Sequence, residues 1–369
     1  MKVCFKMLLT LLLFPMVPME SYAYANNNNG YEPDTTGYYA YHMALKYATG
    51  DGVVQSDIEM AKWFYKSANL GCAKSQYFLG LCYAQGKGVE LSYNKAEKWF
   101  RKAADQGLAE GQYNMGICCY KGLGVKTSFE DAVKWCHKAA EQGNVDAQYH
   151  LANCYDNGQG VIKSSVEAAR WYRKAAEQGH IYAQHNLGIC YSRGEGVEQS
   201  YEESVKWYQM AAEQGYAESQ FLLGERYREG KGVEQSYEKA IFWLRKAAEQ
   251  GNMEAQCNLG MCYAKRQSYT EAIFWNTKAA EQGDAVAQYN LGDFYYYGIG
   301  VSLSYSEAVK WYKKSAEQGY SPAQYELGIC YYNGQGVEKS LTKAIEWIRE
   351  SAKQGHEKAQ TFLRELGTN

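Results

Sequence analysis

The sequence predicts an all-α fold, an α/α superhelical solenoid of nine helix-turn-helix repeats followed by a C-terminal capping helix. The first observation is a fixed period, because the nine tryptophans follow one another at steps of 36 residues with one step of 32. The second is that a glycine closes each repeat at the same offset, as Gly71, Gly107 and Gly143 do. The third is that Pro322 alone of the four prolines falls within the repeats, as expected when a proline inside a helix costs about 3 kcal/mol. A period of about 20–50 residues indicates stacked supersecondary units.

The chain begins with a segment typical of a secretory signal. Two lysines flank the start of an uncharged apolar run at 7–17, and Ala23-Tyr24-Ala25 fits the small-x-small cleavage pattern. The run is shorter than the roughly 20 residues that a membrane span needs. We therefore expect residues 1–25 to be a cleaved signal peptide. The mature chain is then exported, to the periplasm or out of the cell, and no transmembrane segment is expected in it.

The remainder of the chain divides into an arm, the repeats and a cap. Residues 26–35 are polar and contain Gly30 and Pro33, so we expect a flexible N-terminal arm. Residues 356–369 resemble the first half of a repeat and should form a capping helix and tail over the end of the stack. The nine predicted repeats are 36–71, 72–107, 108–143, 144–179, 180–215, 216–251, 252–283, 284–319 and 320–355.

Each repeat should contain two helices joined by a glycine turn. In the fourth repeat, Ala147, Leu151 and Tyr155 recur every four residues, which predicts one face of a first helix. A Gly-x-Gly-Val motif at 158–161 then breaks that helix, and the motif recurs in eight of the nine repeats. A serine with a glutamate three residues later predicts a capping box at the start of the second helix. These pairs are Ser164/Glu167, Ser200/Glu203, Ser268/Glu271 and Ser304/Glu307.

Two recurrent slots predict how the helices pack. The residue after the first-helix leucine is always Gly or Ala, which indicates a close approach of two helices, since glycine inside a helix costs about 1 kcal/mol. We expect the tryptophan slot to fill the gap between repeats and to be core rather than a sugar-binding platform. The seventh repeat lacks four residues between Tyr263 and Ser268, so its turn should be shorter and a bend is expected there.

Ten cysteines follow the predicted signal, and six of them share one slot of the first helix. Residues in the same slot of neighbouring repeats should lie roughly 9–10 Å apart, whereas a disulfide needs Cα atoms within about 7 Å. We therefore interpret the six as small buried hydrophobic residues. A single disulfide bond that involves Cys72 or Cys136 is an alternative that stays open if the compartment is oxidising.

The repeat unit of residues 183–215, AQHNLGICYSRGEGVEQSYEESVKWYQMAAEQG, resembles a Sel-1-like repeat, a relative of the tetratricopeptide repeat. The resemblance covers residues 36 to about 366. It implies an α/α superhelix that acts as an adaptor for protein–protein contacts. Exported bacterial members of the family are similar in layout and often take part in host interaction, envelope processes or signalling.

Catalytic, metal and cofactor sites are not expected. A disulfide-stapled branch of the family is associated with penicillin binding and β-lactamase activity, but its cysteine pairs at the repeat junctions do not occur here. Ser-x-x-Lys occurs three times, at Ser92, Ser236 and Ser340, each time in the helix-capping slot, so we interpret these serines as caps. The six histidines form no His-Glu-x-x-His motif, and Gly-x-Gly-Val does not complete the Gly-x-x-x-x-Gly-Lys-Ser/Thr pattern of a phosphate loop, so we interpret it as a turn between helices. The net charge of −2 is mixed along the chain, which argues against nucleic acid as a partner.

The expected binding surface is the stripe of the first helices that faces away from the leucine core. It carries an aromatic row beside slots of variable charge, which suits a protein or peptide partner because tyrosine anchors interfaces at low entropic cost. The alternative is that these rings merely pack between adjacent first helices, whereas the Tyr296-Tyr297 pair has no such role. The candidate partner-binding residues are Tyr77, Tyr113, Tyr149, His185, Phe221, Tyr289, Tyr296, Tyr297 and Tyr325.

The sequence therefore predicts an exported scaffold that binds a protein or peptide through the concave face of a repeat superhelix. Two rival functions stay open, a weak β-lactam hydrolase and a cell-wall glycan binder.

Overall fold

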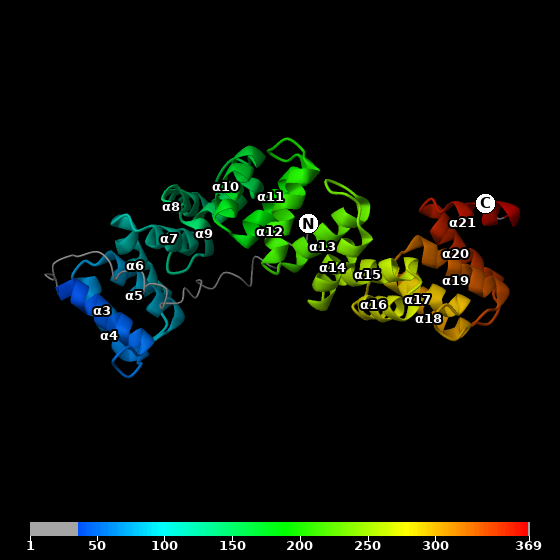
Figure 1. The fold of residues 1–369 in the computed structure, drawn as a ribbon, viewed down its shortest axis with the longest axis horizontal. Coiled ribbons are helices and arrows are strands. Elements are labelled where there is room, and N and C mark those ends of the chain that lie inside the picture. Colours follow the sequence, from blue (N-terminus) through cyan, green and yellow to red (C-terminus); the bar gives the residue numbers. More distant parts are fainter. Residues whose placement is uncertain (1–35, 368–369) are drawn as a thin grey trace. The chain divides into compact units, whose positions relative to one another are not determined.

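The computed structural model describes residues 36–367, and within this range the regular structure is entirely α-helical. The chain divides into two compact units, one that ends at Gln199 and one that begins at Ser200, inside the fifth repeat (Figure 1). The predicted signal peptide, the predicted arm and the last two residues of the tail lie outside the described residues. The all-α repeat fold is confirmed.

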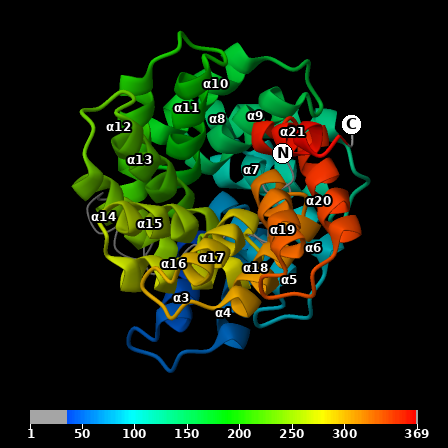
Figure 2. The same ribbon diagram turned by 90° about the vertical axis from the view of Figure 1, so that its right-hand side faces the viewer.

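Helices follow one another as neighbours within each unit, so that each packs on the one before it; Figure 2 shows α19 between α18 and α20. First helices have odd numbers and second helices have even numbers. The first unit contains α3 (Thr36–Thr49), α4 (Asp57–Asn69), α5 (Ala73–Gln85), α6 (Tyr93–Asp105), α7 (Ala109–Lys121), α8 (Phe129–Glu141), α9 (Val145–Asn157), α10 (Ser165–Glu177) and α11 (Ile181–Arg193). The second unit contains α12 (Tyr201–Glu213), α13 (Ala217–Glu229), α14 (Tyr237–Glu249), α15 (Met253–Lys265), α16 (Tyr269–Glu281), α17 (Ala285–Tyr297), α18 (Tyr305–Glu317), α19 (Ser321–Asn333), α20 (Leu341–Lys353) and α21 (Glu357–Glu365).

Glycine and serine set the helix ends. Gly158 closes α9 with φ of +70°, a left-handed conformation that glycine adopts without strain. The second glycine of the turn, Gly160, also has a positive φ, and a methyl group there would lie 2.3 Å from the carbonyl oxygen of Phe129 in the preceding repeat. Ser164 then caps α10, since its hydroxyl accepts from the backbone N–H of Glu167 at 3.3 Å. The Gly-x-Gly motif is therefore both a turn and a contact between repeats.

The small slot of the first helix marks the predicted close approach between two helices. A methyl group added at Gly292 would lie 2.3 Å from Cδ1 of Tyr312, and one at Gly80 would lie 2.5 Å from Cε1 of Phe100. Tyr312 and Phe100 are buried and each follows the tryptophan of its second helix. Glycine in this slot lets the second helix of the same repeat seat a large side chain against the first.

The tryptophan slot itself lies further out than predicted. Trp171 is 1% exposed, but the other eight tryptophans are only partly buried. Two indoles contact the preceding second helix, Trp99 on Tyr65 at 6.1 Å and Trp171 on His137 at 5.6 Å between ring centroids, whereas Trp63 contacts Tyr39 of its own repeat at 5.9 Å. The prediction that tryptophan fills the gap between repeats is confirmed for Trp99 and Trp171, which contact the preceding repeat, although eight of the nine indoles are only partly buried. The centre of the repeat is filled by the residue that follows tryptophan, as Phe100 and Tyr312 show.

A buried glutamine joins each first helix to the preceding repeat. Gln148 of α9 donates from Nε2 to the carbonyl oxygen of Ala140 at 3.1 Å, and its Oε1 accepts from Nε2 of Gln178 at 2.8 Å. Ala140 lies in the last turn of α8, the second helix of the third repeat, and Gln178 is the C-cap of α10. The bond to alanine forms in all nine first helices from α5 to α21, at 3.0–3.4 Å. This glutamine ladder ties the start of a repeat to its own end and to its predecessor.

The seventh repeat has the shorter turn that its sequence predicts. α15 ends at Lys265, and Gln267 takes a positive φ of 61° before α16 begins at Tyr269. Ser268 makes no side-chain capping bond, so the predicted Ser268/Glu271 box is wrong at this one place. The compressed turn changes the backbone of the cap residue, whose φ of −85° differs from the values near −150° in the other second helices. The predicted bend stays a prediction.

The last helix has the role of a cap. Ala359 and Leu363 of α21 are buried against Ile348 of α20. The slot after Leu363, which is Gly or Ala in the nine repeats, holds an exposed Arg364. A second helix cannot approach an arginine as closely as it approaches glycine, so α21 differs from the other first helices in this slot.

The glutamine ladder predicts a position-dependent loss of stability. Gln148→Met keeps the length of the side chain but removes two hydrogen bonds, the donor to the buried carbonyl of Ala140 and the acceptor for Gln178, which together should cost about 1–3 kcal/mol, while the Ala140 carbonyl keeps the N–H of Gly143 at 3.1 Å. Gln178→Met removes the bond to Gln148 and a longer bond to the carbonyl of Lys174 at 3.4 Å, which lie closer to solvent, and should cost less than about 1.5 kcal/mol. The urea midpoint by circular dichroism should therefore fall further for Gln148→Met. Equal midpoints for the two variants would contradict the role given to the buried bond.

Candidate protein-interaction surface

Tyr77 and Tyr113 do not lie on an open surface. Both side chains are buried, and the Tyr77 ring packs on Phe78 at 5.1 Å while the Tyr113 ring lies 5.5 Å from His150. Burial raises the pKa of Tyr113 well above its ordinary value. The prediction that these two rings meet a partner is corrected, because Tyr113 fills the contact between the first helices α7 and α9, and Tyr77 also lies 6.3 Å from the Phe100 ring of α6.

The later members of the aromatic row are partly exposed, and they pack in a recurrent way. Each ring contacts the residue that precedes the next first helix: Tyr149 stacks on His180 at 4.4 Å, and Tyr325 lies 5.0 Å from His356. Tyr289 has the same contact with Tyr320 at 5.5 Å. These rings therefore support the junctions between repeats and also keep an open edge. His185 and Phe221 are also partly exposed.

Tyr296 and Tyr297 differ from each other more than predicted. The Tyr296 ring packs on Tyr305 at 5.1 Å, and its hydroxyl donates to Oε1 of Gln335 at 2.8 Å. The equivalent hydroxyl of Tyr120 makes the same bond to Gln159 at 2.9 Å, so this contact is structural in both units. Tyr296 is therefore corrected to a residue with a packing role. Tyr297 is 58% exposed and touches Tyr296 edge-on at 4.9 Å, so it presents a free ring face.

Beside Tyr297 the surface is acidic. The Tyr312 hydroxyl donates to Oδ1 of Asp293 at 2.6 Å. Burial raises the pKa of Asp293, and burial followed by the charge of Asp293 raises that of Glu326. In the fourth repeat the equivalent bond runs from Tyr172 to the neutral Asn153 at 2.7 Å, so the fold does not require a carboxylate in this slot.

We call the group Tyr289, Asp293, Tyr297, Tyr325 and Glu326, on α17 and α19, the first-helix surface. Sequence reasoning found its tyrosines by their period, and it placed Asp293 in a slot of variable charge. It missed Glu326, because that slot lies between Tyr325 and a core leucine and shows no period of its own.

Three histidines of the first unit lie in apolar surroundings. Burial lowers the pKa of His150, His180 and His185 to about 4 in each case, and the neighbouring His180 contributes to the shift of His150. All three are therefore neutral at pH 7 in the folded chain. His180 also accepts at Nδ1 from the backbone N–H of Ala183 at 3.1 Å, which makes it an N-cap.

The serines and cysteines with possible chemistry have structural roles. Ser92, Ser236 and Ser340 each accept from the backbone N–H of the lysine three residues later, at 3.3–3.4 Å, so they are N-caps. The ten cysteines in the described range are free thiols, and all except Cys72 are buried. Burial raises the pKa of Cys82 to about 12 and that of Cys154 to about 11, which disfavours the reactive thiolate.

Residues 36–367 contain no group of three His, Cys, Asp or Glu side chains placed to hold a metal ion. Over the same residues, no helix combines the length and the apolar character that a membrane crossing requires.

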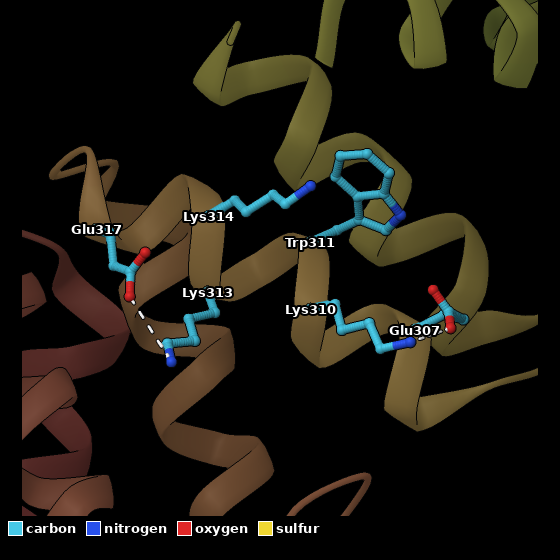
Figure 3. A pocket seen from close by; sticks show the side chains of 6 residues that line it. All are labelled: Glu307, Lys310, Trp311, Lys313, Lys314 and Glu317. Atoms are coloured by element: carbon cyan, nitrogen blue, oxygen red, sulfur yellow. Dashed lines mark hydrogen bonds and ion pairs between the residues drawn. The ribbon is translucent and has the colours of Figure 1, made fainter. Parts of the chain in front are cut away.

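A shallow hollow on α18 is a feature of the second-helix side of the chain. Figure 3 shows Lys314 with its ammonium group 4.2 Å from the centre of the Trp311 ring, and two ion pairs that flank this stack. The pairs are Lys310–Glu307 at 2.5 Å and Lys313–Glu317 at 3.8 Å. All six lining residues come from one helix, so the hollow is a groove between surface side chains.

The neutral histidines predict a loss of stability in acid. A histidine whose folded pKa is about 4 binds fewer protons than it does unfolded, so its contribution is complete above pH 6.5 and falls as the pH drops towards 4. At pH 5.5 each should cost about 1 kcal/mol. The triple variant His150→Asn, His180→Asn, His185→Tyr uses residues that occupy the same slots elsewhere in the chain. Between pH 7.5 and 5.5 its urea midpoint should fall less than that of the native chain, and parallel falls would contradict the prediction.

The Sel1 repeat family matches nine times along the chain. The matched residues are 38–72, 73–108, 109–144, 145–180, 181–216, 217–252, 254–284, 285–320 and 321–356. Among proteins of curated function, none matches.

Two solved structures resemble the chain over most of its length. One is c5321, a protective antigen present in uropathogenic Escherichia coli strains with an SLR fold, at 34% identity and a TM-score of 0.59, over 89% of this chain and 79% of that one. The other is a Sel1 repeat protein from Oxalobacter formigenes, at 28% identity and a TM-score of 0.62, over 94% and 99%. The fold is the scaffold type that is typical of protein–protein interaction. With nine matched repeats, the chain belongs to the Sel1 repeat family.

Proposed function

We propose that this chain is a scaffold that binds a protein or peptide partner through its first-helix surface. The observation that carries the proposal is the exposed ring of Tyr297 beside two carboxyl groups, Asp293 and Glu326, within one unit. An exposed tyrosine gives contact area at low entropic cost, and the carboxyl groups give charge that selects a partner.

A binding role is favoured over a catalytic one by the state of the nucleophiles. The serines of the three Ser-x-x-Lys motifs are engaged as N-caps, and burial raises the pKa of most of the cysteines. Neither set offers the activated nucleophile that β-lactam hydrolysis needs.

Affinity capture tests the surface directly. The chain from residue 26 onward is immobilised beside the double variant Tyr297→Asn, Tyr325→His. Both new residues already occur in these slots in other repeats, as Asn157 and His185. If the native chain retains a protein, the retained amount should be at least tenfold lower on the variant, because the exposed rings supply the anchor.

The control is Tyr237→Ser, which removes an exposed tyrosine from the start of α14 and installs the residue found there in α10. Its retention should equal that of the native chain. Retention that is equal in all three proteins would reject the first-helix surface. Retention of cell-wall glycan in place of protein would favour the rival glycan-binding function.

We further propose that the protein is exported and acts at the cell envelope or in host interaction. The support is the lysine-flanked apolar run ahead of Ala23-Tyr24-Ala25, together with the resemblance to a protective antigen of a uropathogen. Intact-mass measurement on protein recovered from the periplasm and the culture fluid should give a chain that begins at Asn26. A chain found only in the cytoplasm with its first 25 residues in place would reject export.

A further inference from the structure

One slot of the second helix changes character in two consecutive repeats. The residue before the tryptophan is charged in seven repeats, but in the sixth and seventh it is Phe242 and Phe274. These side chains are 52% and 51% exposed. The charged residues in the other repeats are Lys62, Lys98, Lys134, Arg170, Lys206, Lys310 and Glu346.

In its ordinary form the slot carries an ion pair. In five repeats the basic residue bonds to the acid three positions earlier, at 2.5–3.3 Å, as Lys310 does with Glu307 in Figure 3. In α16 phenylalanine removes the pair that a lysine could form with Glu271, and in α14 the residue three positions before Phe242 is Lys239, so that helix lacks the acid as well. Phe242 instead stands edge-on to Trp243 at 5.0 Å, and Phe274 stands edge-on to Trp275 at 5.0 Å. Each helix therefore presents two adjoining aromatic rings where its sister helices present charge.

In each of the two helices a lysine lies over the phenylalanine ring. The ammonium group of Lys246 is 4.7 Å from the centre of Phe242 and 5.2 Å from that of Trp243, and Lys278 is 5.2 Å from the centre of Phe274. Neither lysine forms an ion pair with a carboxylate among the described residues. The rings and the two ammonium groups together form an aromatic surface with local positive charge, which we call the second-helix surface.

The spacing of the two helices fits a helical partner. Second helices of consecutive repeats lie side by side in the stack, as the contact between Tyr65 of α4 and Trp99 of α6 shows, and side-by-side helices are spaced by roughly 10 Å. We expect the same spacing between equivalent residues of α14 and α16, which both pack on α15. Two turns of an α-helix cover about 11 Å. A partner helix with apolar residues at i and i+7 would reach both ring pairs, and acidic residues beside them would reach Lys246 and Lys278.

The charge balance favours a protein over a membrane. The two helices carry Lys239, Arg245, Lys246 and Lys278 against Glu238, Glu249, Glu271 and Glu281, so their net charge is zero. Adsorption to anionic lipid needs a clear excess of basic residues. An acidic partner segment needs only the two local ammonium groups, which have no carboxylate partner.

We propose that the second-helix surface is a docking site for an acidic amphipathic helix of a partner protein. Exposed aromatic residues gathered in this way mark interaction sites. The site is independent of the first-helix surface, since it lies on the second helices α14 and α16 and shares no residue with α17 or α19.

The test uses the chain from residue 26 onward and two synthetic 18-residue helical peptides labelled with fluorescein. Both have leucine at every third or fourth position; one has glutamate on the opposite face and the other has lysine. Fluorescence anisotropy should show binding of the glutamate peptide and at least tenfold weaker binding of the lysine peptide.

Two variants separate the apolar and the charged contributions. The first variant, Phe242→Lys with Phe274→Lys, restores the residue that five other repeats have in this slot. The second, Lys246→Met with Lys278→Met, introduces methionine, which the fifth repeat has in this slot as Met210. The Phe→Lys variant should bind the glutamate peptide at least tenfold more weakly than the native chain does. The Lys→Met variant should bind the glutamate and lysine peptides equally. The control Tyr297→Asn should bind the glutamate peptide like the native chain.

Several outcomes would overturn the proposal. One is equal binding of the glutamate peptide to the native chain and the Phe→Lys variant, and another is equal binding of the two peptides to the native chain. If the native chain binds no peptide but sediments as a dimer, and the Phe→Lys variant sediments as a monomer, the surface would be assigned to contact with a second copy of the chain. Cosedimentation with phosphatidylserine vesicles that the same change abolishes would assign it to a membrane.

Discussion

The contact on which the repeat stack depends is the buried glutamine at the start of each first helix. The last carbonyl groups of a helix have no partner within it, and the side chain of Gln148 supplies a donor to one of them, at Ala140 of the preceding repeat. Its oxygen then fixes Gln178 at the other end of its own repeat. Each repeat therefore becomes complete only when its neighbour is present, as expected for a solenoid whose stability lies in nearest-neighbour contacts.

Because packing and capping are satisfied by the slots that face the core and the neighbouring repeats, the outward slots are free to vary. The exposed position before tryptophan illustrates this, since it accepts lysine, arginine, glutamate or phenylalanine without a change in the helix that carries it. The slot that faces Tyr172 or Tyr312 behaves similarly, with asparagine in one repeat and aspartate in another on the same hydrogen bond. Positions whose residue type varies without any need of the fold are therefore the positions that can select a partner.

The period of the sequence was enough to predict the fold, and the glycine turns, the serine caps and the small slot followed from it. The depth of a side chain could not be read in the same way. Tryptophan and the residue after it share one helix with a difference of 100° in direction, and the sequence does not say which of the two meets Gly292. The aromatic row failed at Tyr77 and Tyr113 for a related reason, since a tyrosine at one helical period is equally suited to a junction and to a surface. Glu326 escaped notice because a single carboxylate among core residues has no period.

The comparison between repeats supplies what the period alone does not. A residue type that returns in every repeat is explained by packing, as the glutamine ladder is. A residue that departs from its slot, while its helix keeps the same bounds, has no structural reason for the change. Phe242 and Phe274 meet this criterion, because the same slot elsewhere holds an ion pair such as Lys310–Glu307 and the helices are equally long. Asp293 meets it as well, since Asn153 accepts the same bond without charge. In a chain of near-identical units, the surfaces that recognise partners are therefore expected where consecutive repeats depart together from the common pattern.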